Sequence, residues 1–161
     1  MKRSLVQATE VAPGTLESFI TMAPMTVAHT LGMLVFGGVL ARHPKLRVVI
    51  AEGGIGWLAY YMERADAVYT KQRYWAKSTL AEPPSQYLRQ LLFTFEEDLA
   101  GMRTYDVIGP EKIMWASDFP HSDTTYPESR QAIAAHFGTL PAEHRHAMIC
   151  GNAARLYGLT G

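Results

Sequence analysis

The chain has 161 residues, a length typical of one domain, and 48% of them are hydrophobic, which is enough for a substantial core. Its 15 basic and 15 acidic residues cancel, which argues against a nucleic-acid-binding stripe and against an acidic disordered tail. The single cysteine, Cys150, excludes an intramolecular disulfide and is typical of a reducing compartment.

No run reaches the roughly 18 consecutive apolar residues of a membrane span. The first residues carry positive charge but lack the apolar core of a signal peptide. We therefore expect a cytoplasmic protein that acts on a small molecule and has no nucleic-acid or membrane partner.

Helix and strand patterns alternate along the first half of the chain. Residues 1–24 are punctuated by glycine and proline and are expected to be irregular. Residues 25–41 are mostly apolar around the circumference and predict a largely buried helix. Residues 46–51 form a β-branched run that predicts a parallel strand covered on both faces. After a glycine-rich turn, residues 57–72 have the apolar spacing of a helix.

The second half of the chain continues the alternation. Two further apolar runs of strand length are present, and each is followed by a helical pattern. The predicted strands are residues 91–95 and 113–116, and the predicted helices are residues 85–90, 99–108, 127–137, 141–149 and 151–158.

This order predicts an α/β fold with βα units and a parallel sheet, in one domain over residues 1–161. A closed barrel needs eight strands, and three are predicted here. An open sheet of three strands leaves both edges bare. The chain is therefore expected to be part of a barrel.

Two of the predicted strands end in a carboxylate. Asp118 follows one strand and Glu52 follows another, and α/β folds place their sites at the carboxyl ends of strands. A carboxylate there can bind a divalent metal or accept a proton from metal-bound water. The structural alternatives are turn capping by Asp118 and, for Glu52, contact with backbone donors of the next helix.

Two residues near these acids are weaker candidates. His121, three residues after Asp118, is a candidate ligand, proton donor or substrate contact, with a solvent-facing loop position as the alternative. Trp57 is a candidate substrate contact, with a core position as the alternative. Residues 96–98 are also acidic, but a charged helix start explains them. A catalytic zinc requires three protein ligands plus water, and Asp118 is the strongest candidate here.

Four segments together resemble the amidohydrolase-related family, in the branch that includes aminocarboxymuconate-semialdehyde decarboxylase and the resorcylate-type decarboxylases. Their order and spacing match over nearly the whole chain from about residue 24. The segments are residues 43–57 (HPKLRVVIAEGGIGW), 93–98 (FTFEED), 115–121 (WASDFPH) and 151–157 (GNAARLY).

The resemblance implies a metal-dependent (β/α)8 TIM barrel, of which this chain carries the C-terminal portion with strands six to eight. Asp118 matches the family's strand-eight aspartate, a metal ligand and proton shuttle. Glu52 stands where decarboxylase members carry a strand-six histidine. The family's remaining ligands, from strands one and five, would lie before Met1. The implied cofactor is a divalent metal ion, with zinc as the expected ion.

By the same resemblance, the complete protein is expected to be a metal-dependent hydrolase acting on a small carboxylated or cyclic substrate. Asp118 and Glu52 are its expected catalytic residues, and His121 and Trp57 its expected substrate contacts. A carboxy-lyase (decarboxylase) is the first alternative, although a carboxylate at position 52 does not donate a proton as an imidazolium does. A catalytically incomplete fragment that acts by association is the second. Bare sheet edges further predict a homo-oligomer.

Overall fold

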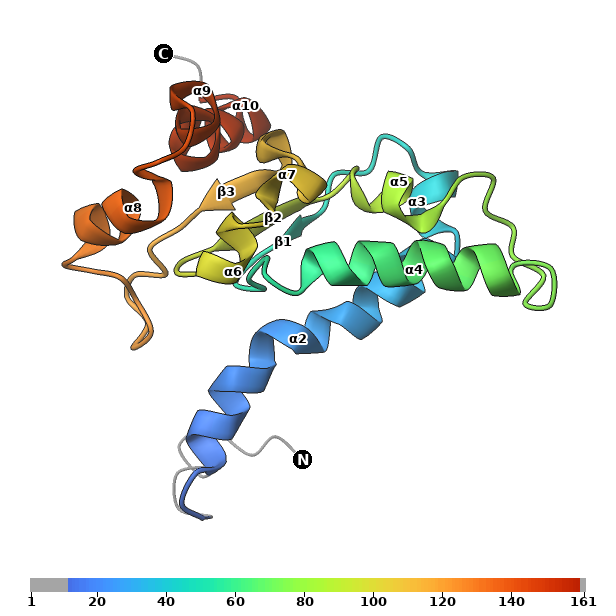
Figure 1. The fold of residues 1–161 in the computed structure, drawn as a ribbon, viewed down its shortest axis with the longest axis horizontal. Helices are drawn as coiled ribbons and strands as arrows, with labels where there is room; N and C mark the ends of the chain where they lie inside the picture. Colours follow the sequence, from blue (N-terminus) through green and yellow to red (C-terminus); the bar gives the residue numbers. More distant parts are fainter. Residues whose placement is uncertain (1–11, 160–161) are drawn as a thin grey trace.

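The computed structural model describes residues 12–159, and its helices and strands alternate in the expected order (Figure 1). Each strand is shorter than predicted but lies within its predicted range. The elements are α2 (Thr15–Phe36), α3 (Val39–Arg42), β1 (Val49–Ile50), α4 (Leu58–Gln72), α5 (Pro84–Leu88), β2 (Leu92–Phe95), α6 (Leu99–Met102), α7 (Tyr105–Ile108), the 3-10 turn η1 (Pro110–Lys112), β3 (Ile113–Trp115), α8 (Ser129–Phe137), α9 (Ala142–His146), the π-helical turn η2 (Ala147–Gly151) and α10 (Asn152–Tyr157).

The three strands form one parallel sheet in the order β1-β2-β3. Ile50 of β1 lies opposite Phe93 of β2, and Phe93 lies opposite Ile113 of β3. Strands that are neighbours in sequence are therefore neighbours in space, joined by helical crossovers as in a βα barrel. Because the strands are parallel, their carboxyl ends meet at one edge of the sheet.

One face of the sheet carries the core. Phe93 and Phe95 are buried, whereas the alternate residues of β2, Leu92 and Thr94, are only half-buried. The buried side chains cluster with residues from the surrounding helices, among them Leu31, Leu58, Leu88, Ile108, Phe137 and Met148. Among the described residues, the helices therefore cover the Phe93 side of the sheet far more completely than the Thr94 side.

The strand predicted over residues 46–51 is confirmed in place but not in burial. Its regular part is Val49–Ile50, and only Ile50 is buried, while Leu46 is exposed. The prediction of a strand covered on both faces is therefore wrong for the described residues. The reason is that the described helices cover mainly one face of the sheet, so Ile50 is buried while Val49 stays half-buried.

The first helix differs most from expectation. It begins at Thr15, ten residues earlier than predicted, and it contains Pro24. A proline inside a helix removes one hydrogen bond and bends the axis, and Figure 1 shows α2 changing direction near its middle. Residues 15–24 were therefore wrongly expected to be irregular, because one proline bends this helix without ending it.

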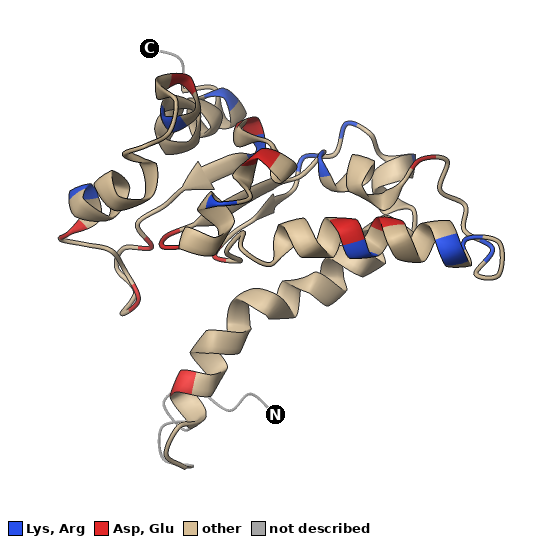
Figure 2. Cartoon of the chain, in the orientation of Figure 1, with Lys and Arg blue, Asp and Glu red and all other residues tan. Residues whose placement is uncertain are grey.

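The prediction that this helix is largely buried is also wrong for the described residues. Only Leu31 and Val35 of α2 are buried. The first half of α2 projects away from the sheet, and Figure 2 shows it free of charge apart from Glu17 near its start. Seven large apolar side chains of α2 are exposed: Leu16, Phe19, Ile20, Met22, Met25, Met33 and Phe36.

By its length and mean hydropathy α2 passes a test for a membrane-spanning helix, although it contains no unbroken run of about 18 apolar residues. In the described part of the chain, α2 is long and apolar enough to cross a membrane, judged by length and composition alone. Isolated polar residues such as Thr21, Thr26 and His29 interrupt the apolar run without making the helix polar overall. Threonine hydroxyls at positions 21 and 26 donate hydrogen bonds to carbonyls within the helix, of Glu17 and Ala23.

The helices after β2 and β3 also depart from the predicted boundaries. The helix expected over residues 99–108 is two short helices, α6 and α7, separated at Arg103 and Thr104. The two helices expected over residues 141–158 run on without a break, through η2. Asn152 fixes this last segment to the sheet, because its side-chain amide donates to the carbonyls of Pro110 and Ile113.

Candidate metal centre

Three carboxylates lie at the carboxyl edge of the sheet, one after each strand. Glu52 follows β1, Glu96 follows β2 and Asp118 follows β3. The structure brings Glu52, Asp118 and His121 together, with one ligand atom of each within 4.8 Å of the others. His121 Nδ1 lies 3.0 Å from Asp118 Oδ2, so the histidine and the aspartate are directly paired. The site residues predicted at positions 52, 118 and 121 are therefore neighbours in space.

Glu52 and Asp118 share an unusual backbone conformation. Their φ angles are 54° and 56°, in the left-handed region that side-chain-bearing residues rarely adopt. Such strained positions persist only where the surroundings hold them, and they are concentrated at functional sites. The Glu52 amide donates to Thr94 Oγ1 at 2.9 Å, which ties the end of β1 to the neighbouring strand. The sharp turn after each strand thus directs its carboxylate towards the same place.

The loop that carries Asp118 is held by two adjacent threonines. Thr124 Oγ1 donates to the Ser117 carbonyl at 2.6 Å, and the Thr125 amide donates to the same oxygen at 3.0 Å. The His121 amide donates to the Asp118 carbonyl at 2.9 Å, which closes a tight turn. This turn brings the imidazole of His121 back over the carboxylate of Asp118. Asp118 is mostly buried, whereas His121 is exposed, with 65% of its side-chain surface accessible.

Glu96 was expected to be part of a charged helix start, but the structure places it in the same cavity as Glu52, Asp118 and His121. Its carbonyl accepts a hydrogen bond from Trp115 Nε1 at 2.9 Å. Its Oε1 is buried and has no hydrogen-bond partner among the described residues. Burial raises the pKa of Glu96 above its ordinary value, and the nearby carboxylates of Asp118, Glu52 and Asp123 add to this shift.

A signal for Glu96 was present in the sequence. Glu96 follows its strand directly, as Glu52 and Asp118 follow theirs, so the strand-end rule applied to all three. The helix-start explanation is correct for Asp98 alone, whose side chain caps α6 by accepting from the Gly101 amide. One acidic run therefore contains residues with different roles.

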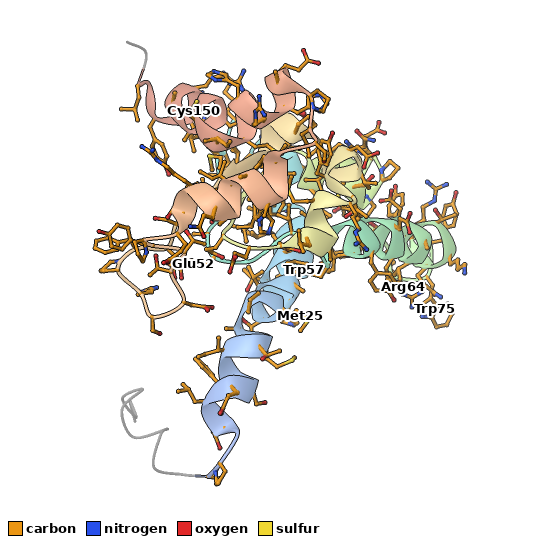
Figure 3. The ribbon with its side chains drawn as sticks, turned by 60° about the vertical axis from the view of Figure 1, so that its left-hand side comes forward. Met25, Glu52, Trp57, Arg64, Trp75 and Cys150 are labelled. Carbon is orange, nitrogen blue, oxygen red and sulfur yellow. The ribbon has the colours of Figure 1, made fainter. Side chains whose placement is uncertain are left out.

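These residues border a cavity of about 520 Å³. One wall is acidic and comes from the strand ends, and the opposite wall is apolar and comes from the first half of α2. Figure 3 shows Glu52, which follows β1, above the first half of α2, and it labels Met25 on α2 itself. The lining residues are Leu16, Phe19, Ile20, Ala23, Pro24, Glu52, Glu96, Asp118, His121, Ser122 and Asp123.

Trp57, the remaining sequence-based candidate, lies outside this lining. Its indole Nε1 donates to the Gly53 carbonyl at 2.7 Å, and its ring packs edge-on against Tyr61. In this structure the side chain therefore braces the turn after Glu52. Its expected contact with substrate stays a prediction.

The residues fit a divalent cation. Two carboxylates and one imidazole are a donor set found for zinc and for manganese, and three protein ligands leave room for water or substrate. The unpaired buried oxygen of Glu96 in the same cavity is a further donor without a partner. Asp118 is the ligand best placed to hold an ion, because it is the most buried of the three.

Comparison with solved structures places this arrangement in a known fold. The chain superposes on 5-carboxyvanillate decarboxylase from Sphingomonas paucimobilis with a TM-score of 0.67 and 25% identity, covering 81% of this chain and 39% of that one. An amidohydrolase from Mycobacterium avium subsp. paratuberculosis superposes with a TM-score of 0.71 and 23% identity, covering 87% of this chain and 35% of that one. A dihydroxybenzoic acid decarboxylase from Polaromonas sp. superposes with a TM-score of 0.68 and 17% identity, covering 92% of this chain and 47% of that one. That structure holds manganese and the inhibitor 2-nitroresorcinol.

This chain thus spans less than half the length of the structures that it matches. No curated protein sequence matches it. A family model described as amidohydrolase matches residues 15–159, which include α2 and all three strands. The expected fold, a portion of a TIM barrel, is confirmed. The chain belongs to the amidohydrolase family.

Proposed function

We propose that this chain forms the strand-six to strand-eight part of a divalent-metal-dependent hydrolase that acts on a small cyclic or carboxylated substrate. The observation that carries the proposal is the meeting of Glu52, Asp118 and His121 beside a cavity at the carboxyl edge of the sheet. Cavities of this size hold small molecules. The apolar wall from α2 suits a hydrocarbon ring, and the acidic wall suits the metal.

The chemistry follows from the donor atoms of these groups and from their place beside the cavity. Asp118, Glu52 and His121 would hold the ion, which when bound polarises a carbonyl and lowers the pKa of bound water. Asp118 accepts the proton of the attacking water and delivers it to the leaving group, and His121 orients the Asp118 carboxylate. Hydrolysis needs a group that accepts a proton from the attacking water, and a positioned carboxylate can serve as that group.

The identity of the ion is part of the proposal. The expectation of zinc stays a prediction, since the donor set accepts zinc and manganese alike. The Polaromonas relative holds manganese, so manganese is the ion to test first. Glu52 and His121 are both exposed, and we expect this part of the barrel to bind either ion more weakly than a site with a buried ligand set.

Replacement of Asp118 tests the proposed role. In the manganese-loaded protein, Asp118→Asn should lower turnover of a hydrolysed ester, lactone or cyclic amide by about 10²- to 10⁴-fold, because it removes the proton-transferring group. Asp123→Asn is the matched control, since Asp123 lines the same cavity but lies outside the three-ligand cluster. Near-normal turnover in Asp118→Asn would refute the role.

Decarboxylation is the second candidate, and the names of the similar structures favour it. Two of the three relatives described above are decarboxylases of aromatic acids. The reaction differs from hydrolysis in needing a proton delivered to carbon. Release of CO2 from 5-carboxyvanillate or 2,6-dihydroxybenzoate, lost in Asp118→Asn, would establish this reaction instead of hydrolysis.

A further inference from the structure

The carboxylate of Asp98 joins two separate connections of the barrel. Its Oδ2 accepts hydrogen bonds from the amides of Ile55 and Gly56, at 2.7 and 2.6 Å. Its Oδ1 accepts from the Gly101 amide at 2.8 Å. Capping of α6 accounts for the Gly101 bond alone. The other two bonds reach back more than 40 residues, to the turn that follows Glu52.

Asp98 is itself held from a third connection. Its backbone amide donates to His136 Nε2 at 3.0 Å. His136 is buried in α8, and its Nδ1 lies 2.8 Å from the Ala132 carbonyl. Since Nε2 accepts a hydrogen bond, the proton of this imidazole is on Nδ1, where it is donated to that carbonyl. The connections after β1, β2 and β3 therefore meet at Asp98, and each of them also carries one carboxylate of the candidate metal centre.

The turn after β1 is built around this carboxylate. A Cβ atom at Gly56 would lie 2.6 Å from Asp98 Oδ1, and one at Gly54 would lie 3.3 Å from Oδ2. Gly54 also has a φ angle of 58°, which glycine adopts without strain. The glycines thus allow the backbone to approach the carboxylate closely enough for two amides to donate to one oxygen.

We propose that Asp98 is a positioning residue, which fixes the turn after β1 and so holds the Glu52 carboxylate beside Asp118. Glu52 lies three residues before the first amide that Asp98 binds, and its left-handed φ needs support from its surroundings. This inference rests on the proposed function, because it concerns the same cation site. Asp98 touches neither the cavity nor the ligand cluster, so it acts only through the turn.

Nuclear magnetic resonance of the full chain tests the geometry without any metal. In the wild type, the amide protons of Ile55 and Gly56 should be protected from exchange, and the Glu52 amide should show its contact with Thr94. In Asp98→Asn both features should be lost. In Asp66→Asn both should remain, although that aspartate likewise accepts from a backbone amide, that of Ser85. Unprotected wild-type amides, or an unchanged Glu52 contact in a folded Asp98→Asn, would overturn the inference.

A variant that keeps the helix cap covers the case in which Asp98→Asn does not fold. Asp98→Ser retains an oxygen that can cap α6, because serine is a good N-cap residue. Serine has no second oxygen and a shorter side chain, so it should still lose the Glu52 contact. Retention of that contact in Asp98→Ser would overturn the inference equally.

Manganese titration, followed by electron paramagnetic resonance, then tests the link to the site. Loss of a residue that orients a ligand typically lowers metal affinity about 10- to 100-fold, and we expect about tenfold for Asp98→Asn. In a Glu52→Gln background, the same substitution should change affinity by less than about twofold, because its effect passes through Glu52. Equal losses in both backgrounds would show a merely structural role. A wild-type chain that takes up no manganese even at high concentration would instead overturn the proposed cation site, and the resonance data would still decide the role of Asp98.

Discussion

The helices α2 and α4 lie on either side of β1 in the chain, yet they are buried in different ways. In α4 the buried positions follow helical spacing, as in Leu58, Met62, Ala65 and Tyr69, and the opposite face is polar. In α2 most positions are apolar, with isolated polar residues scattered among them, and only Leu31 and Val35 are buried. A periodic pattern therefore determines which face of α4 is covered. The apolar residues of α2 follow no single face, so its sequence does not determine which side of the helix is buried.

The difference has a bearing on the site. The first half of α2 forms the apolar wall of the cavity, through Leu16, Phe19 and Ile20. No residue of α4 is among the residues that line this cavity, and its buried side chains instead pack in the core against the sheet. One helix is thus a structural element of the core, and the other presents apolar surface both to the cavity and to its surroundings.

The largest expected effect compares one methionine in each helix. Met62 of α4 is 3% exposed and Met25 of α2 is 42% exposed. Met62→Ala should lower the free energy of unfolding by about 3 kcal/mol, because it leaves a cavity in the core. Met25→Ala should change it by less than about 0.5 kcal/mol. Urea unfolding followed by circular dichroism gives both values, and equal losses would show that α2 is as well packed as α4.

A second experiment tests whether the exposed face of α2 causes association. We expect the chain to form oligomers through this face, since large exposed apolar patches promote association. Phe19→Glu should shift the protein towards monomer in sedimentation velocity runs. Tyr60→Glu, at a residue 71% exposed on α4, is the matched control and should leave the distribution unchanged. A wild-type chain that is monomeric at all concentrations would contradict the expectation.

The smallest expected effect concerns Glu96, which faces α2 across the cavity. Because its pKa is raised in the folded chain, its protonated form stabilises the fold. That contribution is fully present below the ordinary pKa of 4.5 and is lost as the pH rises through the folded value. Glu96→Gln should therefore raise the melting temperature at pH 7 by about 2 °C, with the effect kept small by partial exposure, and not at pH 4. No difference at pH 7 would mean that the carboxylate is well solvated.

Much of the fold was accessible from the sequence because its signals are local. The β-branched and aromatic runs placed all three strands, and the spacing within residues 57–72 predicted α4 almost to its ends. The burial of α2 was not accessible, because burial depends on neighbours that periodicity does not specify. The break within residues 99–108 was also missed, since the one glycine in this range, Gly101, lies within α6 and not at the break after it.

The site was only partly accessible from the sequence. The position of Asp118 and Glu52 at strand ends predicted that they share one edge, and the structure places them together with His121. The same strand-end rule covers Glu96, whereas the bonds made by Asp98 depend on three connections meeting in space. A residue's neighbours along the chain do not reveal that convergence.

The left-handed backbone at Glu52 and Asp118 changes how these positions should be probed. Alanine, the usual reference residue, removes the carboxylate but keeps a Cβ in a conformation that disfavours one. An alanine scan would therefore mix lost chemistry with retained strain. Glycine removes the carboxylate and the strain together, whereas asparagine tolerates this conformation and, at position 118, also keeps the shape of the side chain. A glycine variant and an asparagine variant at each position therefore separate the loss of the carboxylate from the change in backbone strain.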